Sequence, residues 1–428
     1  MNRIVRIAAV AVVAAASCDM GAAWADTLTV GARRLVDVAT GKVLENRIVT
    51  IVDGRITEVR LRKAGEEVAI DLGERTLVPG LIDAHTHLVG REESSPYDDL
   101  RETGPQAAIA GVINAKKTLA AGFTTVRDLG SRDFADVALR DAIAAGQIEG
   151  PRMFVAVKSL SSTGGHGDRN DLPDDVHVDR YSGIADGAAE IAKKVRENVR
   201  HGADWIKVLA TGGVMSAGTD PKMAQYTETE LRAAVDAAKE RGRDVAAHAH
   251  GTEGIVRALK AGVRSIEHAS MLDDEAIRLV KQNDAFLVPN PLTNAYMLER
   301  GAAGGYQPYQ LEKAKMILTL KMESLKKAVK AGLSGSIAYG TDAGVQIHGI
   351  NGKQFALYVE AGMTPMQAIQ SATVVAARLL RQETRLGQIA PGFVADLVAV
   401  DGDPTKDVKL LEKPVFVMKD GEVVVPLP

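Results

Sequence analysis

"LVPGLIDAHTHL", residues 77–88, holds a Pro-Gly turn, a short apolar run and two histidines that stand one residue apart. Side chains at positions i and i+2 of a β-strand lie on the same face, so a strand here would direct His85 and His87 to one place. Two neutral imidazoles that converge suit a divalent metal ion, whereas two core histidines would each need a hydrogen-bond partner. A His-x-His pair also arises by chance in surface loops, so the metal hypothesis needs support from elsewhere in the chain.

Short apolar runs recur along the chain, and amphipathic helical segments separate most of them. The runs cover residues 77–87, 123–128, 152–158, 205–209, 244–250, 264–268, 285–289 and 336–342. Capping boxes mark two of the helix starts, one at Thr227 and Glu230 and one at Thr364 and Gln367. Because the alternation is long and no G-x-G-x-x-G sequence follows the first strand, the pattern favours a (β/α)8 barrel over a doubly wound sheet. We therefore expect an α/β fold with a TIM barrel.

The two ends of the chain have a different pattern. Residues 26–76 alternate apolar and polar positions in short runs that turn sequences such as ATGK and VDGR interrupt, and residues 386–428 do the same. We expect these two segments to pair into one small β-sandwich domain. The catalytic barrel would then occupy residues 77–385.

Residues 1–25 have the features of a secretory signal peptide. Arg3 and Arg6 precede an apolar stretch that is too short to span a bilayer, and small residues stand at the cleavage positions before Asp26. One alternative is a lipoprotein signal acylated at Cys18, although the usual leucine is missing; another is an ordinary N-terminal helix, although no polar residues alternate with the apolar face. We expect export to the periplasm or the cell exterior, and a mature chain without cysteine, since Cys18 is the only one.

Composition narrows the class of function. With 46% hydrophobic and 25% charged residues, the chain of 428 residues has the balance of an ordinary globular protein. A net charge of −3 and an aromatic content of 4% both argue against nucleic acid as a partner. We expect an enzyme that acts on a small molecule, has no stable membrane span and assembles as a homo-oligomer.

Polar residues that could carry chemistry stand at the ends of the expected strands. Besides the first pair they are Lys207 in DWIKVLATGG, His248 and His250 in VAAHAHG, His268 in SIEHAS and Asp342 in AYGTDAG. The C-terminal ends of barrel strands open at one mouth, so a barrel would bring these residues together. Each alone has an ordinary explanation, such as a turn-capping aspartate, but a lysine in a buried strand is costly without a partner. One shared site explains all of them.

Taken together, these motifs resemble the amidohydrolase superfamily over nearly the whole mature chain. TGGHGD at 163–168, KVLATGGVMS at 207–216 and AHAHGTEGI at 247–255 are similar to its imidazolonepropionase-like branch. That branch includes Xaa-Pro and other dipeptidases and ochratoxin-hydrolysing amidases. The resemblance implies a binuclear site with two divalent metal ions, which we expect to be zinc.

The resemblance also implies how the site is built. His85, His87 and Asp342 would hold one ion, and the histidines of the fifth and sixth strands would hold the other. Lys207 would bridge both ions as a carbamate formed with CO2, whose negative charge offsets part of theirs. A hydroxide that bridges the ions would attack the substrate near neutral pH, while Asp342 takes the proton and delivers it to the leaving amine.

The roles of three histidines depend on the branch pattern. His248 and His250 share one face of their strand, so both could enter the mouth. The branch assigns metal binding to His248, together with His268, and substrate binding to His250. His166 lies in a Gly-rich loop that could be a solvated connection only. The resemblance instead makes it a catalytic and substrate-binding residue that meets the substrate carboxylate or the developing oxyanion.

The sequence thus predicts a binuclear metal-dependent amidohydrolase. It would cleave the amide between an acyl group and an amino acid, in a dipeptide, an N-acyl amino acid or an ochratoxin-like substrate. The alternative is a cyclic amide hydrolase or deaminase of the imidazolonepropionase type. Mononuclear deaminases of the superfamily usually lack the lysine of the fourth strand and carry a glutamate in a His-x-x-Glu arrangement. This chain has Lys207, and the residue three positions after His248 is Gly251. A non-catalytic relative would be expected to lose ligands, yet all six expected positions are filled.

Overall fold

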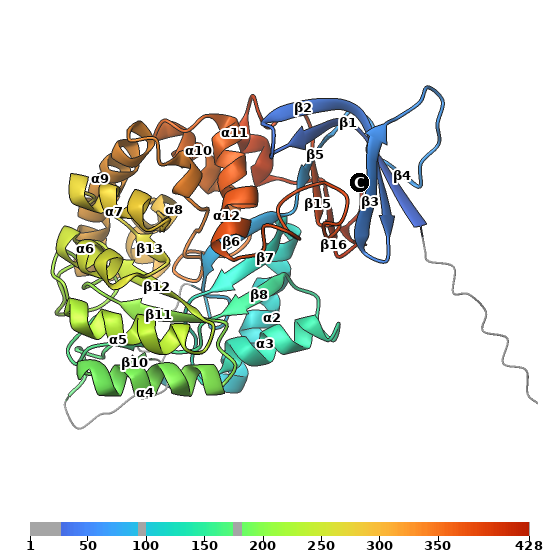
Figure 1. Cartoon of the computed structure of the whole chain (residues 1–428). Coiled ribbons are helices and arrows are strands. Elements are labelled where there is room, and N and C mark those ends of the chain that lie inside the picture. Colours follow the sequence, from blue (N-terminus) through green and yellow to red (C-terminus); the bar gives the residue numbers. More distant parts are fainter. Residues whose placement is uncertain (1–26, 93–99, 174–181, 428) are drawn as a thin grey trace, which may run out of the picture.

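The computed structural model describes residues 27–92, 100–173 and 182–427 (Figure 1). A β module built from both chain ends lies at one side, and a larger body with helices around its strands fills the rest. The predicted signal peptide at residues 1–25, with Cys18, lies outside the described residues. Among the described helices, none combines the length and the apolar character that a membrane crossing requires.

Both ends of the chain contribute to one mixed sheet of eight strands. Its strands are β1 (Thr27–Asp37), β2 (Lys42–Val52), β3 (Arg55–Leu61), β4 (Ile70–Asp71), β5 (Thr76–Pro79), β15 (Leu397–Val400), β16 (Phe416–Lys419) and β17 (Glu422–Val425). β5 joins the two chain ends, because it pairs parallel with β1 and antiparallel with β15. The sandwich arrangement of this module and the boundaries 26–76 and 386–428 stay predictions.

The larger body alternates strands and helices. Its strands are β6 (Leu81–Thr86), β7 (Phe123–Asp128), β8 (Arg152–Val155), β9 (Ser159–Ser161), β10 (Ser182–Ile184), β11 (Trp205–Leu209), β12 (Asp244–Ala249), β13 (Ser265–His268) and β14 (Phe286–Val288). Its helices are α2 (Gly104–Ala120), α3 (Ala135–Ala144), α4 (Gly187–Arg200), α5 (Glu228–Lys239), α6 (Thr252–Ala261), α7 (Asp274–Gln282), α8 (Pro291–Arg300), α9 (Pro308–Lys330), α10 (Gln354–Glu360), α11 (Pro365–Gln370) and α12 (Ala376–Leu379). Both predicted capping boxes are present, at the starts of α5 and α11.

The inner strands run parallel in two groups, ordered β6-β7-β8 and β10-β9-β11-β12-β13-β14. The predicted eighth strand, residues 336–342, is wrong as a regular strand, because this segment makes only isolated bridges to its neighbours. It is still hydrogen-bonded on both sides. Ala338 donates its N–H to Leu287 O at 2.9 Å, and Ala84 donates its N–H to Tyr339 O at 2.8 Å. The segment therefore lies between β14 and β6.

The run over residues 77–87, predicted as one strand, is divided between the two parts of the molecule. β5 belongs to the terminal sheet and β6 to the inner strands, with Gly80 between them. A Cβ atom at Gly80 would lie 2.3 Å from Thr124 Oγ1 and 2.6 Å from Asp396 Cβ. The chain thus crosses from one sheet to the other at the Pro-Gly pair, and only a residue without a side chain fits at position 80.

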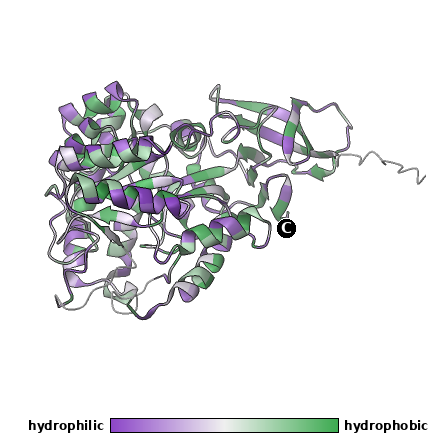
Figure 2. Cartoon of the chain, turned by 60° about the horizontal axis from the view of Figure 1, so that its bottom comes forward, coloured by the Kyte–Doolittle hydropathy of each residue, from purple (hydrophilic) through white to green (hydrophobic). Residues whose placement is uncertain are grey.

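Most residues of the inner strands are buried. Every residue of β6, β7 and β11 is buried, and in Figure 2 the hydrophilic residues gather on the helices and loops around these strands. Strands that are covered on both faces usually consist of apolar residues, because a polar group there is costly without a partner. Each charged or imidazole side chain on these strands therefore requires a specific interaction that stabilises it.

We expect Gly80→Ala to lower the free energy of unfolding by about 2 kcal/mol, the usual effect of an overpacked site. The added methyl group would collide with Thr124 and Asp396. Gly335→Ala is the matched control, because no heavy atom lies within 4 Å of a Cβ atom at that position. Urea unfolding of both variants tests whether a side chain is excluded at position 80, and equal stability of the two variants would contradict this.

Candidate metal centre

One cavity of about 200 Å³ collects every side chain that the sequence singled out as a site residue. Most of them stand at the C-terminal ends of β6, β12 and β13 or of the segment 336–342, and one lies within β11. They are His85, His87, His166, Lys207, His248, His250, His268 and Asp342. The inner strands and the segment 336–342 therefore bring these side chains to one place, and His166 joins them from the loop after β9.

The first donor group consists of His85, His87 and Asp342. Nε2 of each histidine lies 3.3 Å from Oδ1 of Asp342, and one ligand atom from each of the three lies within 4.8 Å of the others. Asp342 has a φ of 61°, in the left-handed region that residues other than glycine seldom adopt. Such strain gathers at functional sites.

Each remaining ring nitrogen of the first donor group lies beside an oxygen atom that can only accept. Nδ1 of His85 lies 2.8 Å from Oε2 of Glu267, and Nδ1 of His87 lies 3.0 Å from the carbonyl oxygen of Gly130. An acceptor at Nδ1 keeps the proton there and leaves the lone pair on Nε2. Burial lowers the pKa of His87, but the contact with Asp342 outweighs burial and raises it, so this carboxylate attracts positive charge at Nε2. A metal cation held by the two Nε2 atoms and the oxygen of Asp342 would supply that charge. The first donor group therefore fits a divalent metal ion such as zinc.

A buried ion pair behind His85 escaped the sequence analysis. Nη2 of Arg127 lies 2.8 Å from Oε1 of Glu267, and neither side chain is exposed. Burial raises the pKa of Glu267, but the Arg127 guanidinium and the contact with His85 outweigh it and hold the pKa at about 2. Arg127 also lies over the Trp205 ring, 4.5 Å from its centroid. The signal that could have revealed the pair is a charged residue inside each of two buried strands, although other polar residues stand beside both in β7 and β13.

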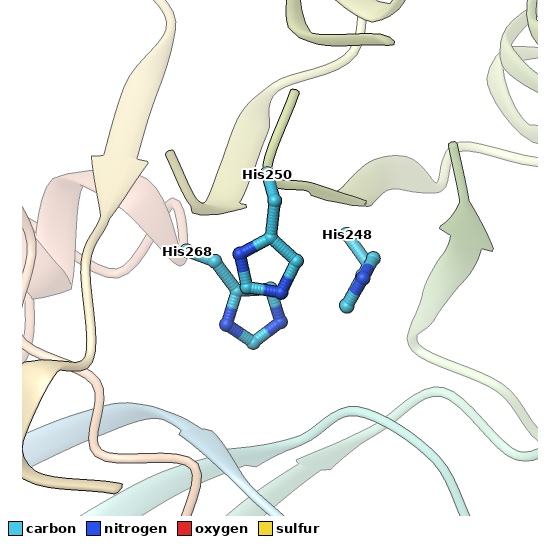
Figure 3. A group of neighbouring side chains, drawn as sticks. All are labelled: His248, His250 and His268. Carbon is cyan, nitrogen blue, oxygen red and sulfur yellow. The ribbon is translucent and has the colours of Figure 1, made fainter. Parts of the chain in front are cut away.

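The second donor group consists of His248, His250 and His268, whose rings lie near one another in Figure 3. The rings of His250 and His268 stack with their centroids 4.6 Å apart, and the ring of His248 lies 4.3 Å from that of His268. Burial and the positive charges of nearby groups hold the pKa of all three well below its usual value. Three neutral imidazoles within 4.8 Å of one another form a donor set for a second metal ion.

His248 and His250 both enter the cavity. Nε2 of His248 lies 3.1 Å from the carbonyl oxygen of Gly212, and Nδ1 of His250 lies 2.8 Å from Oγ of Ser270. Each imidazole therefore has one ring nitrogen engaged and one that can face a metal ion or a substrate. The assignment of metal to His248 and of substrate to His250 stays a prediction.

Lys207 lies beside the first donor group. Its Nζ atom is 3.4 Å from Nε2 of His85, and the residue is only 2% exposed. Burial lowers the pKa of Lys207 to about 8, although the charges of Glu267 and Asp342 act in the opposite direction. An amine with this pKa is partly uncharged near neutral pH, which makes it a nucleophile rather than a permanent cation.

His166 reaches the cavity because Gly213 leaves space for it. Its Nδ1 atom lies 2.8 Å from Oγ of Ser216, and its ring lies 4.4 Å from the ring of His248. A Cβ atom at Gly213 would lie 2.2 Å from Cε1 of His166. A glycine at position 213 is therefore required for the observed position of the His166 imidazole.

Lys321 and Asn294 also line the cavity, and neither was predicted from the sequence. Lys321 belongs to α9 and Asn294 to α8. A lysine in an amphipathic helix usually lies on the solvated face, so the sequence of α9 does not indicate that Lys321 is buried. Only the packing of the helices against the inner strands reveals these two residues.

The chain belongs to the amidohydrolase family, whose sequence profile matches residues 76–425. An ochratoxinase from Aspergillus niger is 33% identical over 368 residues, which make up 81% of this chain and 75% of the relative. The membership predicted from the sequence motifs is confirmed. It makes this protein a hydrolytic enzyme that acts on a small molecule, and it supports metal-dependent amide hydrolysis.

Two solved structures align with almost the whole chain. A Xaa-Pro dipeptidase with bound methionine in its active site has a TM-score of 0.85 and 36% identity, and the alignment covers 93% of this chain and 99% of that one. A prolidase complexed with N-methylphosphonate-L-proline has a TM-score of 0.86 and 32% identity, with 94% and 100% covered. These similarities imply a TIM barrel with α/β content.

We expect Glu267→Gln to lower the free energy of unfolding by about 3 kcal/mol at pH 7, because it leaves Arg127 buried without its counter-charge. The folded-state pKa of Glu267, about 2, lies below the value of an unfolded glutamate. The ion pair therefore stabilises the protein above that unfolded value, and the stabilisation is lost as the pH falls toward 2.

Urea unfolding between roughly pH 5 and pH 2 measures this effect. The difference between wild type and Glu267→Gln should shrink as the pH falls. Glu253→Gln is the control, since it removes an exposed pair with Arg257 that contributes less than about 1 kcal/mol. A difference that is the same at every pH would show that the carboxylate charge is not what stabilises the fold.

Proposed function

We propose that the protein hydrolyses the amide bond between an acyl group and an amino acid with the help of two metal ions. The observation that carries the proposal is the convergence of the first and second donor groups on one cavity, with Lys207 beside them. The ochratoxinase, the Xaa-Pro dipeptidase and the prolidase support a substrate with such a bond.

The two donor groups define where the ions, proposed to be zinc, would be held. His85, His87 and Asp342 would bind one ion, and His248 with His268 the other. Lys207 would connect them as a carbamate, because its pKa of about 8 leaves part of the amine uncharged and able to combine with CO2. Bound ions would supply a Lewis acid for the substrate carbonyl and lower the pKa of water to near neutral.

Asp342 is the proposed proton carrier. Burial raises the pKa of its carboxyl group, but the charges of His85, His87 and Lys207 outweigh burial and hold the pKa below its usual range. The carboxylate is therefore ionised at neutral pH, and one of its oxygens can accept a proton and donate it to the leaving amine.

His166 is the proposed donor to the substrate oxygen. Burial lowers its pKa to about 4, so the ring is neutral at pH 7. When Ser216 Oγ donates its hydrogen bond to Nδ1, the ring proton lies on Nε2 and can be donated to negative charge that develops on the substrate. Substrate binding by His250 would place the amino-acid part of the substrate next to His248 and His268.

The shape of the cavity favours small substrates. Its volume of about 200 Å³ lies below the range of pockets that enclose drug-sized ligands. Val214, Met215, Met297 and Val345 contribute apolar wall. We therefore propose dipeptides and short N-acyl amino acids with an apolar side chain as the first substrates to test. We also propose that the protein is exported, on the basis of the sequence of residues 1–25. We further propose that it assembles as a homo-oligomer.

Release of free amino acid from a panel of dipeptides, N-acyl amino acids and ochratoxin A tests the function. The zinc-loaded protein should release amino acid, and the chelated protein should not. Turnover of cyclic amides or deaminase substrates in place of the panel would contradict the proposal and favour the imidazolonepropionase type of reaction.

Lys207→Ala should lower the zinc content below two ions per chain and reduce kcat by roughly a hundredfold or more, since a bridging ligand is lost. Zinc content by elemental analysis and kcat on the best substrate measure the two effects. Lys239→Ala, at an exposed lysine of α5, serves as the control. A Lys207→Ala variant that keeps two ions and full activity would refute the bridge.

Gly213→Ala should push the ring of His166 out of the cavity and lower kcat roughly a hundredfold, because small displacements of a catalytic group are costly. Zinc content should stay at the wild-type level. Gly183→Ala is the matched control, since the nearest heavy atom to a Cβ there lies 3.7 Å away. Unchanged kcat in Gly213→Ala would show that His166 has no catalytic role.

A further inference from the structure

Lys321 is a buried lysine whose hydrogen bonds all go to carbonyl oxygens. Its Nζ atom donates to Asn290 O at 3.1 Å, to Asn290 Oδ1 at 2.8 Å and to Asn294 Oδ1 at 2.7 Å. The residue is 1% exposed. These contacts use all three N–H groups of the ammonium. A buried charge is expensive where an apolar side chain of similar length could pack, so a specific role is expected of this lysine.

Asn290 connects Lys321 to a residue of the second donor group. Its Oδ1 atom, which accepts from Lys321, also lies 2.8 Å from Nδ1 of His268. The Asn290 side chain is fully buried, and its Nδ2 atom has no hydrogen-bond partner among the described residues. An isolated asparagine could turn either its oxygen or its nitrogen toward an imidazole. All three contacts of Lys321 Nζ are with oxygens that only accept, so Lys321 is the donor and holds Asn290 with its oxygen toward both neighbours.

The orientation of Asn290 decides the tautomer of His268. An acceptor at Nδ1 requires the ring proton to lie there, and a neutral imidazole then carries its lone pair on Nε2. With the amide reversed, Nδ2 would donate to Nδ1 and the proton would move to Nε2, where it blocks metal binding. We propose that Lys321 is a positioning residue that acts through Asn290 to keep Nε2 of His268 available to the second metal ion. The proposal rests on the proposed function, since it takes His268 as a ligand.

The first donor group supports this interpretation by contrast. There Nδ1 of His85 faces the carboxylate of Glu267, and Nδ1 of His87 faces a backbone carbonyl oxygen. Both of these groups only accept, so their direction cannot be reversed. Only His268 has a side-chain amide in this position, and that amide is the one that contacts a buried lysine. Lys321 therefore fixes the orientation of the Asn290 amide, which could otherwise be reversed.

The tautomer of His268 can be read directly in the metal-free protein. In the wild type, 15N chemical shifts of labelled histidine should report His268 with its proton on Nδ1, and Lys321→Met should shift the population toward the Nε2-protonated form. Zinc titration against a competing chelator should then find one of two sites weakened roughly 10- to 100-fold, the usual effect of losing an orienting partner of a ligand. The other site should keep its affinity.

A double variant separates orientation from packing. Asn290→Asp introduces a group that accepts with either oxygen, so it does not depend on the lysine for its direction. In the Lys321→Met background it should restore the Nδ1-protonated tautomer and most of the lost zinc affinity. Lys327→Met is the control, because it removes from the same helix a lysine that pairs with Asp274 and contacts the carbonyl oxygen of Leu272.

An unchanged tautomer and unchanged zinc affinity in Lys321→Met would overturn the proposal, and so would a double variant that recovers neither. If Lys321→Met does not fold, Lys321→Gln takes its place, since its amide can turn either way and the same weakening is expected. A wild-type protein that binds fewer than two zinc ions would contradict the proposed function instead, while the tautomer of His268 would still decide the role of Lys321.

Discussion

The contact between His85 and Glu267 is the interaction on which the rest of the site depends. A proton on Nδ1 of His85 would face this carboxylate at 2.8 Å, and the Nε2 lone pair would then face Asp342 and Lys207. Glu267 can stay ionised in a fully buried position because Arg127 neutralises it. The inner strands thus hold a buried charge network beside the cavity, and the donor atoms of the first donor group converge in that cavity.

Carboxylates of the inner strands also fix the backbone around the cavity. Asp83 accepts hydrogen bonds from the N–H of Thr341 at 2.9 Å, from its Oγ1 at 2.6 Å and from Nδ2 of Asn351 at 2.8 Å. These bonds tie β6 to the segment that carries Asp342, which makes only isolated bridges. Side-chain hydrogen bonds therefore replace a regular strand ladder at the point where Asp342 must leave the sheet.

The sequence predicted much of the site and less of its surroundings. His85, His87 and Asp342 could be found because they stand at strand ends in short motifs, and a lysine within an apolar strand is conspicuous for the same reason. The division of the run 77–87 could not be found, since it arises from the close approach of distant residues to Gly80. Lys321 lies in a helix whose pattern gives no sign that this position faces the cavity.

The two-metal centre is tested most directly by anomalous X-ray diffraction from crystals of the zinc-loaded protein, measured at the zinc absorption edge. We expect two peaks per chain. One should lie among His85, His87 and Asp342, the other beside His248 and His268, and the density of Lys207 should extend between them. A single peak, or two peaks away from these donor atoms, would contradict the central claim that the inner strands of this protein build a two-metal hydrolytic centre.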